Sequence, residues 1–469
     1  MTNSKTYSIP SSKTLQSTAL ILNEKIISGD GTVNITELEG DTDASLVNIT
    51  VTNVSIASSG TPTFSGSFPA GTTNNQIVNS LTLTGSLSSS INYQISSSST
   101  LTANASIILG KNVTIDSNCS LIVNNYTTGD LDFVSNSGTV TVNVIDGSSL
   151  VNSNLDEVNT INIPSGISAS ITSANAVSLA SKLDVSGTLN VTGYNDSGDL
   201  DFSSHSGTIN VTIEGGELVN NNLDEVDTIT IPNSITTTSS FSNLTSLSSK
   251  LTGGGNITLS DSITSATSQN ITDLNTLMNT ITGIFIGSIS GAKAQLTNIQ
   301  ANDDTPIQRL TITTTDQVSV SEATTIAKAT TLTNMTFSGG ISDVKSSFCN
   351  AAGTFTTNTS SNDYTSVKNK STSHDLTITN TNLTFLQLEA IAESTTGDIT
   401  IPTDSDTILD TVTNIFTSGT TFTDGVVGVN SEKSSINSGG VLKVTISGAN
   451  SSSEQGNALV SAGYEVTQD

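Results

Sequence analysis

Two stretches of this chain nearly repeat each other: GDLDFVSNSGTVTVNV at residues 129–144 and GDLDFSSHSGTINVTI at residues 198–213. They belong to longer copies that begin at Tyr126 and Tyr194 and continue through NLDEV and Thr-Ile-x-Ile-Pro to Ser-Lys-Leu. The copies are offset by 68 to 69 residues. Self-similarity at a fixed offset is typical of repeat architectures, so this duplication predicts a fold built from stacked units.

Apolar residues alternate with Thr and Asn inside each copy. Valine occupies every second position of residues 140–144, and Ile or Val does so in residues 209–213. A period of two predicts half-buried strands, and Gly, Asn or Asp closes them at short intervals. Similar runs occur at residues 80–87 and 105–123. We therefore expect a mainly β fold, a parallel β-solenoid or β-helix, in which coils bury Val, Ile and Leu and stack Asn and Thr in ladders.

Short helices are expected between the strands. Residues 270–281 carry apolar side chains along one helical face, and residues 384–394 do the same with Phe385, Leu388, Ile391 and Ala392. Ser319 and Glu322 have the spacing of a capping box ahead of an Ala-rich stretch. We expect the apolar faces of these helices to lie against the core.

The same patterns divide the chain into four segments. Residues 1–95 form a β-rich N-terminal region and a candidate assembly segment, and residues 96–260 form a β-solenoid that holds the duplicated unit. Residues 261–440 continue as strand-plus-helix repeats, and residues 441–469 form a C-terminal tail that is a candidate export or assembly segment.

The charge balance argues against two classes of partner. The chain has a net charge of −27, with 14 Lys and Arg against 41 Asp and Glu. Nucleic-acid binding needs clustered basic residues, so we expect no nucleic-acid partner. An anionic membrane would repel the chain, and there is no apolar run long enough to span a bilayer, so we expect no membrane insertion. An acidic surface instead attracts divalent cations.

Cysteine usage and the first residues bear on location. Cys119 and Cys349 fit neither a disulfide framework nor a metal motif, so we expect both to be buried as small hydrophobic residues. The first residues show no apolar stretch of a secretory leader. The chain is therefore expected either in the cytosol or, as we favour, outside the cell after secretion that does not use a signal peptide.

Acidic residues recur at matched positions of the two copies and are candidate calcium ligands. Residues i and i+2 of an extended chain share a face, so each GDLDF stretch presents two aspartates on one side. Each NLDEV stretch adds an Asp-Glu pair. Ca²⁺ prefers six to eight hard oxygen ligands, whereas the alternative interpretation is a turn in which each Asp accepts backbone hydrogen bonds. The candidates are Asp130, Asp132, Asp156, Glu157, Asp199, Asp201, Asp224 and Glu225.

The sequence offers little for catalysis, and we expect no enzymatic activity. His205 stands where the other copy has Asn136, an exchange that a catalytic histidine should not tolerate. Nucleophile-elbow and phosphate-loop motifs are missing. A β-helix enzyme that degrades polysaccharides remains an alternative, but the chain has no Trp and only 6 Tyr to form sugar platforms.

Several segments resemble a known class of secreted proteins. LTITTTDQ at residues 310–317, VSVSEATTIAKAT at residues 318–330 and VSGTLNVTG at residues 185–193, together with GDLDFS, resemble the β-strand repeats of large bacterial surface proteins. Such proteins, common in marine cyanobacteria, are surface-layer or adhesin-like and leave the cell by type I secretion. The resemblance covers about residues 100–420 and implies a β-solenoid, a cell-surface location and no catalysis. The calcium-binding pattern Gly-Gly-x-Gly-x-Asp of related proteins does not occur.

These observations lead to one expected function and one main alternative. We expect an extracellular structural protein that self-assembles at the cell surface as a surface layer or filament, with calcium bridging its acidic faces. Its partner would then be further copies of itself. The alternative is an adhesin or a phage-fibre-like receptor-binding protein whose partner is a cell-surface glycan.

Overall fold

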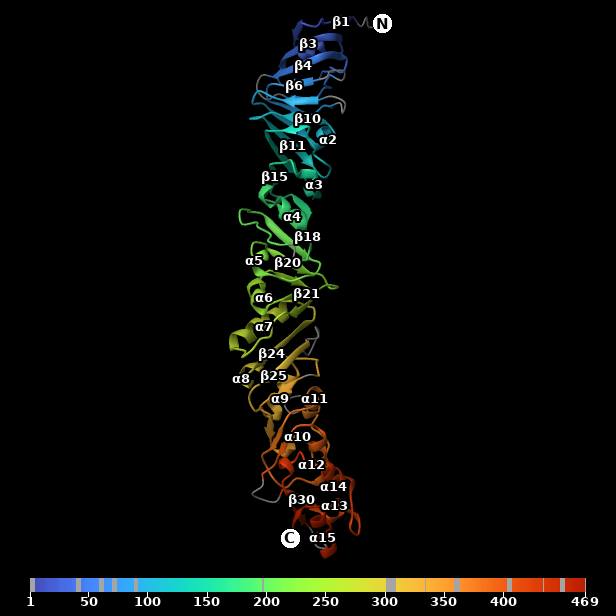
Figure 1. Cartoon of the computed structure of the whole chain (residues 1–469), viewed down its shortest axis with the longest axis vertical. Coiled ribbons are helices and arrows are strands. Elements are labelled where there is room, and N and C mark those ends of the chain that lie inside the picture. The colour runs from blue at the N-terminus through green and yellow to red at the C-terminus, as the bar shows by residue number, and fades with distance from the viewer. Residues whose placement is uncertain are drawn as a thin grey trace. The chain divides into compact units, whose positions relative to one another are not determined.

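The computed structural model describes residues 5–38, 44–58, 63–69, 74–87, 92–195, 198–300, 309–333, 335–357, 363–402, 407–432, 434–447 and 452–468 (Figure 1). The fold is mainly β, with 38% of residues in strands and 25% in helices. The chain divides into two compact units: unit 1 holds residues 1–216 and 220–230, and unit 2 holds residues 217–219 and 231–469. The four-segment division predicted from sequence patterns has different boundaries and stays a prediction.

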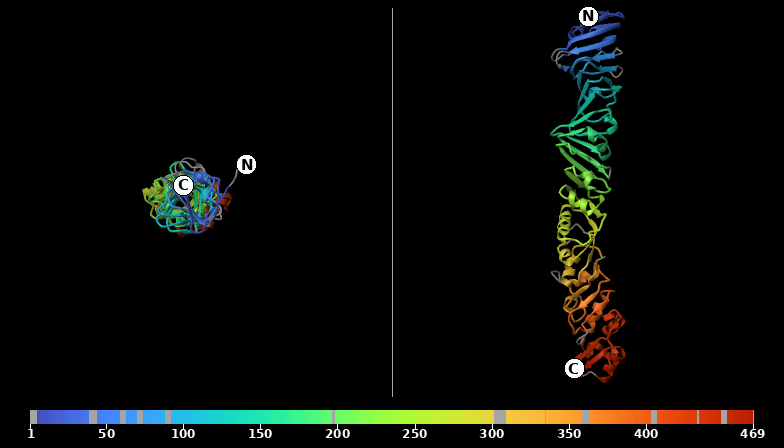
Figure 2. Two further views of the ribbon diagram at one scale, coloured as in Figure 1. Left: turned by 90° about the horizontal axis from the view of Figure 1, so that it is seen from above. Right: turned by 60° about the vertical axis from the view of Figure 1, so that its left-hand side comes forward.

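Unit 1 consists of parallel sheets (Figure 2, blue to green), and over residues 49–194 successive strands belong to different sheets. The first sheet contains β1 (Thr6–Ser8), β2 (Thr14–Ser17), β3 (Ile26–Leu38), β4 (Ile49–Ser58), β6 (Asn74–Ile77), β8 (Asn92–Ile95), β10 (Asn112–Ile115) and β12 (Ser135–Asn136). The second contains β5 (Thr63–Phe64), β7 (Leu81–Leu83), β9 (Thr100–Asn104), β11 (Ser120–Tyr126), β13 (Thr139–Val144), β15 (Thr160–Ile163) and β17 (Leu183–Val185). After β13 a third sheet takes β14 (Ser148–Leu150) and β16 (Ser168–Thr172) in alternation with the second sheet, and then the consecutive strands β18 (Thr188–Tyr194), β19 (Thr208–Ile213) and β20 (Thr228–Ile231).

The period-2 pattern positions the core of unit 1. Leu81 pairs with Leu101, which pairs in turn with Leu121, and all three side chains are at most 1% exposed. The ladder continues through Val140. Each strand therefore contributes its inward residues to one apolar column, which explains how so polar a chain builds a core. Short helices follow some strands: α1 (Ala19–Leu22), α2 (Ala105–Ile108), α3 (Asn152–Leu155), α4 (Ser173–Leu179) and α5 (Asn220–Leu223).

Asparagines form the predicted ladder on the other side of these strands. The Asn143 amide donates to Asn124 Oδ1 at 2.7 Å, and the Asn162 amide donates to Asn143 Oδ1 at 2.8 Å. The Asn143 amide both donates and accepts, so this partly buried polar group is satisfied by the strands on either side. The prediction of an Asn ladder is confirmed for these strands.

The duplication also repeats an irregularity in strand pairing. The pairing of β11 with β13 shifts register between Val123 and Tyr126, and the pairing of β18 with β19 shifts between Val191 and Tyr194. One residue at each bulge has a positive φ, 55° at Asn125 and 70° at Gly193. The bulge turns both tyrosines inward, and each is 0% exposed.

Unit 2 combines parallel strands with more helix. One sheet contains β21 (Thr236–Ser239), β23 (Asn256–Leu259), β24 (Phe285–Gly291), β25 (Arg309–Thr314) and β26 (Thr336–Phe337), and β22 (Leu251–Gly253) precedes β23. Two smaller parallel sheets contain β27 (Ile341–Asp343), β28 (Leu376–Ile378) and β29 (Ile399–Thr400), and then β30 (Ile408–Thr411), β33 (Lys443–Ser447) and β34 (Glu465–Gln468). An antiparallel pair consists of β31 (Phe416–Ser418) and β32 (Thr421–Phe422).

The helices of unit 2 confirm the predicted helical stretches. The helices are α6 (Phe241–Leu247), α7 (Ser268–Thr280), α8 (Lys293–Leu296), α9 (Val320–Ala327), α10 (Lys345–Phe348), α11 (Tyr364–Lys370), α12 (Phe385–Glu393), α13 (Val412–Ile415), α14 (Asp424–Glu432) and α15 (Ser453–Ser461). The capping box of Ser319 and Glu322 opens α9. The apolar faces of α7 and α12 are buried as expected.

Candidate functional site

The two acidic stretches of the first copy lie against each other. The backbone N–H of Leu131 donates to the carbonyl of Asn154 at 3.0 Å, and the N–H of Phe133 donates to Glu157 Oε2 at 3.0 Å. Leu131 and Phe133 point into the core and are at most 5% exposed. The Glu157 carboxylate therefore holds the GDLDF backbone in place through a charge-assisted hydrogen bond.

The second copy builds the same corner. Leu200 N–H donates to the Asn222 carbonyl at 3.2 Å, and Phe202 N–H donates to Glu225 Oε2. Leu200 and Phe202 are buried. The matched glutamates thus have a structural role that accounts for their presence in both copies.

The aspartates of the two corners face solvent. Asp130, Asp132, Asp156, Asp199, Asp201 and Asp224 are all exposed. Asp201 Oδ1 accepts the Ser203 hydroxyl at 3.0 Å and the Ser203 N–H at 3.4 Å, and these bonds lower the pKa of Asp201. This contact is the turn arrangement that the alternative interpretation predicts. Asp130 lies near Tyr126, whose pKa is raised mainly by burial and, to a lesser extent, by that negative charge.

Calcium binding at these corners stays a prediction. Among the described residues, no three His, Cys, Asp or Glu side chains form a group that could hold a metal ion, and Glu157 and Glu225 already accept backbone N–H groups. Calcium needs six to eight oxygens. The corner acids would therefore need carbonyls, water or a second molecule to complete the coordination of an ion.

We predict that the glutamates and aspartates of one corner differ in their effect on stability. Glu157→Gln should lower the free energy of unfolding of unit 1 by about 1 kcal/mol, because the Phe133 N–H loses an ionised acceptor. The matched change Asp132→Asn, at an exposed position, should alter it by less than about 0.5 kcal/mol. Urea unfolding of both variants checks this. Equal losses would contradict the anchoring role of Glu157.

His205 has a scaffold contact. Its Nδ1 accepts the Val185 N–H at 3.2 Å, while in the other copy Asn136 Oδ1 accepts the Gly138 N–H at 3.2 Å. Both side chains thus present an acceptor to a backbone donor, which explains why His and Asn are interchangeable here. Burial lowers the pKa of His205, and nearby Asp184, Asp201 and Glu225 oppose that shift.

Unit 2 contains a buried polar cluster that the sequence did not indicate. Tyr364 Oη lies 3.0 Å from His374 Nε2 and 2.8 Å from Ser394 Oγ, and His374 Nδ1 lies 3.2 Å from Ser371 Oγ. Tyr364 and His374 are at most 1% exposed, and Phe337 and Phe348 pack against their rings. Burial lowers the pKa of His374 to about 4. Such a satisfied, enclosed network stabilises the fold and offers no access to a substrate.

The two cysteines are buried, as predicted. Cys119 and Cys349 are free and at most 1% exposed. Burial raises the pKa of the Cys349 thiol to about 12, so it is not a reactive thiolate.

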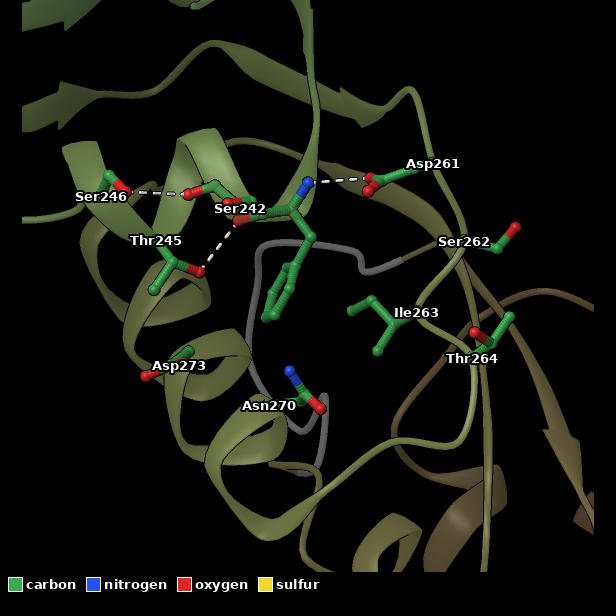
Figure 3. A pocket seen from close by; sticks show the side chains of 10 residues that line it. Ser242, Thr245, Ser246, Asp261, Ser262, Ile263, Thr264, Asn270 and Asp273 are labelled. Carbon is green, nitrogen blue, oxygen red and sulfur yellow. Dashed lines mark hydrogen bonds between the residues drawn. The ribbon is translucent and has the colours of Figure 1, made fainter. Parts of the chain in front are cut away.

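A polar hollow lies beside α6 and α7 of unit 2 (Figure 3). It has a volume of about 420 Å³, and Asp261, Ile263, Asn270 and Asp273 contribute to its lining. Asp261 Oδ1 accepts the Phe241 N–H at 2.8 Å, so this carboxylate also closes the start of α6. Ser242, Thr245, Ser246, Ser262 and Thr264 also line the hollow, and the hydroxyls of Thr245 and Ser246 donate to carbonyls of α6.

Each parallel sheet ends in strands that pair along one side only, for example β5, β12 and β17, and the first and last strands of the described residues are of this kind. In unit 1, β1 and β2 both pair with β3, and no other strand of the described residues pairs with them. In unit 2, β34 pairs with β33, and its second edge likewise has no partner within the described ranges. Such edges present backbone N–H and C=O groups that another chain can pair with.

Comparison of the chain with models of protein families, with curated proteins and with solved structures found no match. In the part of the chain that the structure describes, none of the helices has the length and apolar character to cross a membrane.

Proposed function

We propose that this chain is an extracellular structural protein that self-assembles at the cell surface as a surface layer or filament. The observation that carries the proposal is that the first strands of the described residues, β1 with β2, and the last, β34, each pair along one side only, as the end strands of the other sheets also do. Two different edges that meet form a heterologous contact, and such a contact produces an open-ended assembly unless its rotation closes a ring. The proposal includes no catalytic step.

We infer a parallel β-solenoid as the scaffold of this assembly. From β4 to β18, successive strands join alternate sheets, and paired residues such as Leu81, Leu101 and Leu121 are offset by one circuit of the chain. Each circuit thus adds one strand to each sheet, as a coil of a solenoid does. In such a scaffold the stacking that builds one molecule can continue into the next.

Calcium is proposed to act between molecules. The net charge of −27 would make copies repel each other, and the exposed aspartates of the two corners offer oxygen ligands. A divalent cation held by carboxylates of two neighbours would complete its coordination and remove that repulsion.

The surface location has its own test. Immunogold labelling and extraction of the cell surface should find the protein outside the cell, in a continuous layer or in filaments. Labelling confined to the cytosol would contradict the extracellular part of the proposal.

The alternative function, a receptor-binding protein for a cell-surface glycan, has one supporting observation. The hollow of Figure 3 offers hydroxyl, amide and carboxylate groups that can hydrogen-bond to a sugar. A glycan-binding assay with Asp273→Ala as the control variant separates this candidate from the structural proposal.

A further inference from the structure

An apolar hollow lies at the edge formed by β1 and β2 of unit 1, and exposed lysines occur in the same stretch of sequence. Tyr7, Leu15, Ile21, Leu22 and Ile27 line a hollow of about 220 Å³ together with Ser17 and Lys25, and we call these seven residues the N-terminal seat. Tyr7 is 47% exposed and Ile21 is 64% exposed, and the neighbouring Leu20 is 66% exposed. Large apolar side chains that stay exposed beside an open strand edge mark an interaction surface.

The residues around the seat are basic, although the chain is strongly acidic. Lys5, Lys13 and Lys25 are exposed, and Glu24 is the one acid among residues 5–27. Three of the chain's 14 basic residues thus lie in this short stretch. An acidic partner would be attracted here and repelled by most of the remaining surface.

At the edge of β34 in unit 2, acidic and apolar side chains are exposed. β34 carries the exposed Glu465, which pairs in register with Lys443 of β33, and α15, which precedes it, carries the exposed Glu454. Val460 on α15 is 56% exposed, so the α15–β34 segment also offers an apolar side chain. The order of strands follows the chain in both places, since β34 comes last in its sheet and β1 and β2 come before β3.

We propose that the N-terminal seat of one molecule binds the α15–β34 segment of a second copy of this chain. The inference rests on the proposed self-assembly and names its contact surfaces. β34 of one copy adds in parallel to the free edge of β1 or β2 of the next, which continues the parallel stacking within each molecule. Lysines at the seat face Glu454 and Glu465, and the exposed valine and isoleucine lose contact with water.

Charge-reversal variants test this pairing. The first variant, Lys13→Glu with Lys25→Glu, has acidic surfaces at both ends, and the second, Glu454→Lys with Glu465→Lys, has basic surfaces at both ends. Each variant alone should raise the concentration needed for assembly by more than about tenfold, because like charges then meet at the contact. An equimolar mixture should restore assembly, because each seat then meets an opposite charge.

The control is Lys111→Glu with Arg309→Glu, which changes the net charge by the same amount as the first variant but outside both surfaces, and it should leave assembly near that of the wild type. Every substituted end residue is exposed, so we expect each variant to fold. Circular dichroism verifies this. Sedimentation velocity and electron microscopy give the readout. If the wild type assembles but the end variants assemble equally well, or their mixture fails to recover, the contact lies elsewhere and this inference is wrong while the proposed function stands. If the wild-type protein never assembles, both this inference and the proposed function are contradicted.

Discussion

Gly207→Ala is expected to lower the free energy of unfolding of unit 1 by about 3 kcal/mol. A Cβ at this position would lie 2.3 Å from the carbonyl oxygen of Gly187 and 2.9 Å from Val185 Cγ1. The Ser-Gly-Thr turn that contains Gly207 stacks directly on the Ser-Gly-Thr turn that contains Gly187. A side chain of any size would therefore push the two strands apart, since the obstacle is backbone and cannot rotate away.

A second glycine of unit 1 is the matched control. At Gly147, where φ is +78°, a Cβ would meet no atom within 4 Å. Gly147→Ala should therefore cost only about 1 kcal/mol, the penalty for a left-handed residue. Guanidinium unfolding, with hydrogen exchange of the β18 and β19 amides, distinguishes the two effects. A loss at Gly207 no larger than that at Gly147 would contradict the close stacking of the turns.

Acidification is expected to destabilise unit 2 through His374. In the unfolded chain this histidine takes up a proton below its ordinary pKa of about 6.5, whereas burial in the folded state lowers its pKa to about 4. Between these two pKa values the unfolded state binds more protons than the folded state. The contribution of His374 to the free energy of unfolding is therefore fully present above about pH 6.5 and declines as the pH falls to about 4. The expected loss is about 3 kcal/mol.

The variant His374→Gln isolates this effect from the many carboxylates that titrate in the same range. Both proteins share those carboxylates, so the difference between their pH profiles reports on the histidine. Unfolding free energies measured at several values between pH 7 and pH 4 should fall more steeply for the wild type. Parallel profiles would show that His374 is accessible to protons in the folded state.

The sequence predicted the repeated elements well because their signals are local. Alternation in residues 139–144 and 208–213 depends on neighbouring side chains alone, and β13 and β19 lie there. The same holds for the capping box at Ser319, which involves residues three positions apart. The buried cysteines followed from the absence of a ligand pattern around them.

Contacts between distant residues could not be predicted in this way. Glu157 reaches the backbone of Phe133 across 24 positions, and the sequence presented that glutamate only as an acid with a matched copy. His374 and Tyr364 lie outside the duplicated unit of residues 126–251, so no matching residue in a second copy indicated that they have a role. Their role depends on which helices pack together, and periodicity does not determine that packing. The open edges likewise depend on the order of strands in the sheets.

Electron microscopy of the purified protein, with millimolar calcium and with a chelator, tests self-assembly most directly. The structure leads us to expect filaments or sheets that lengthen with protein concentration, form more readily with calcium, and show a strand spacing of about 4.8 Å that continues from one molecule to the next. Single, separate molecules in both conditions, at every concentration examined, would contradict the proposal that this chain is a self-assembling structural protein.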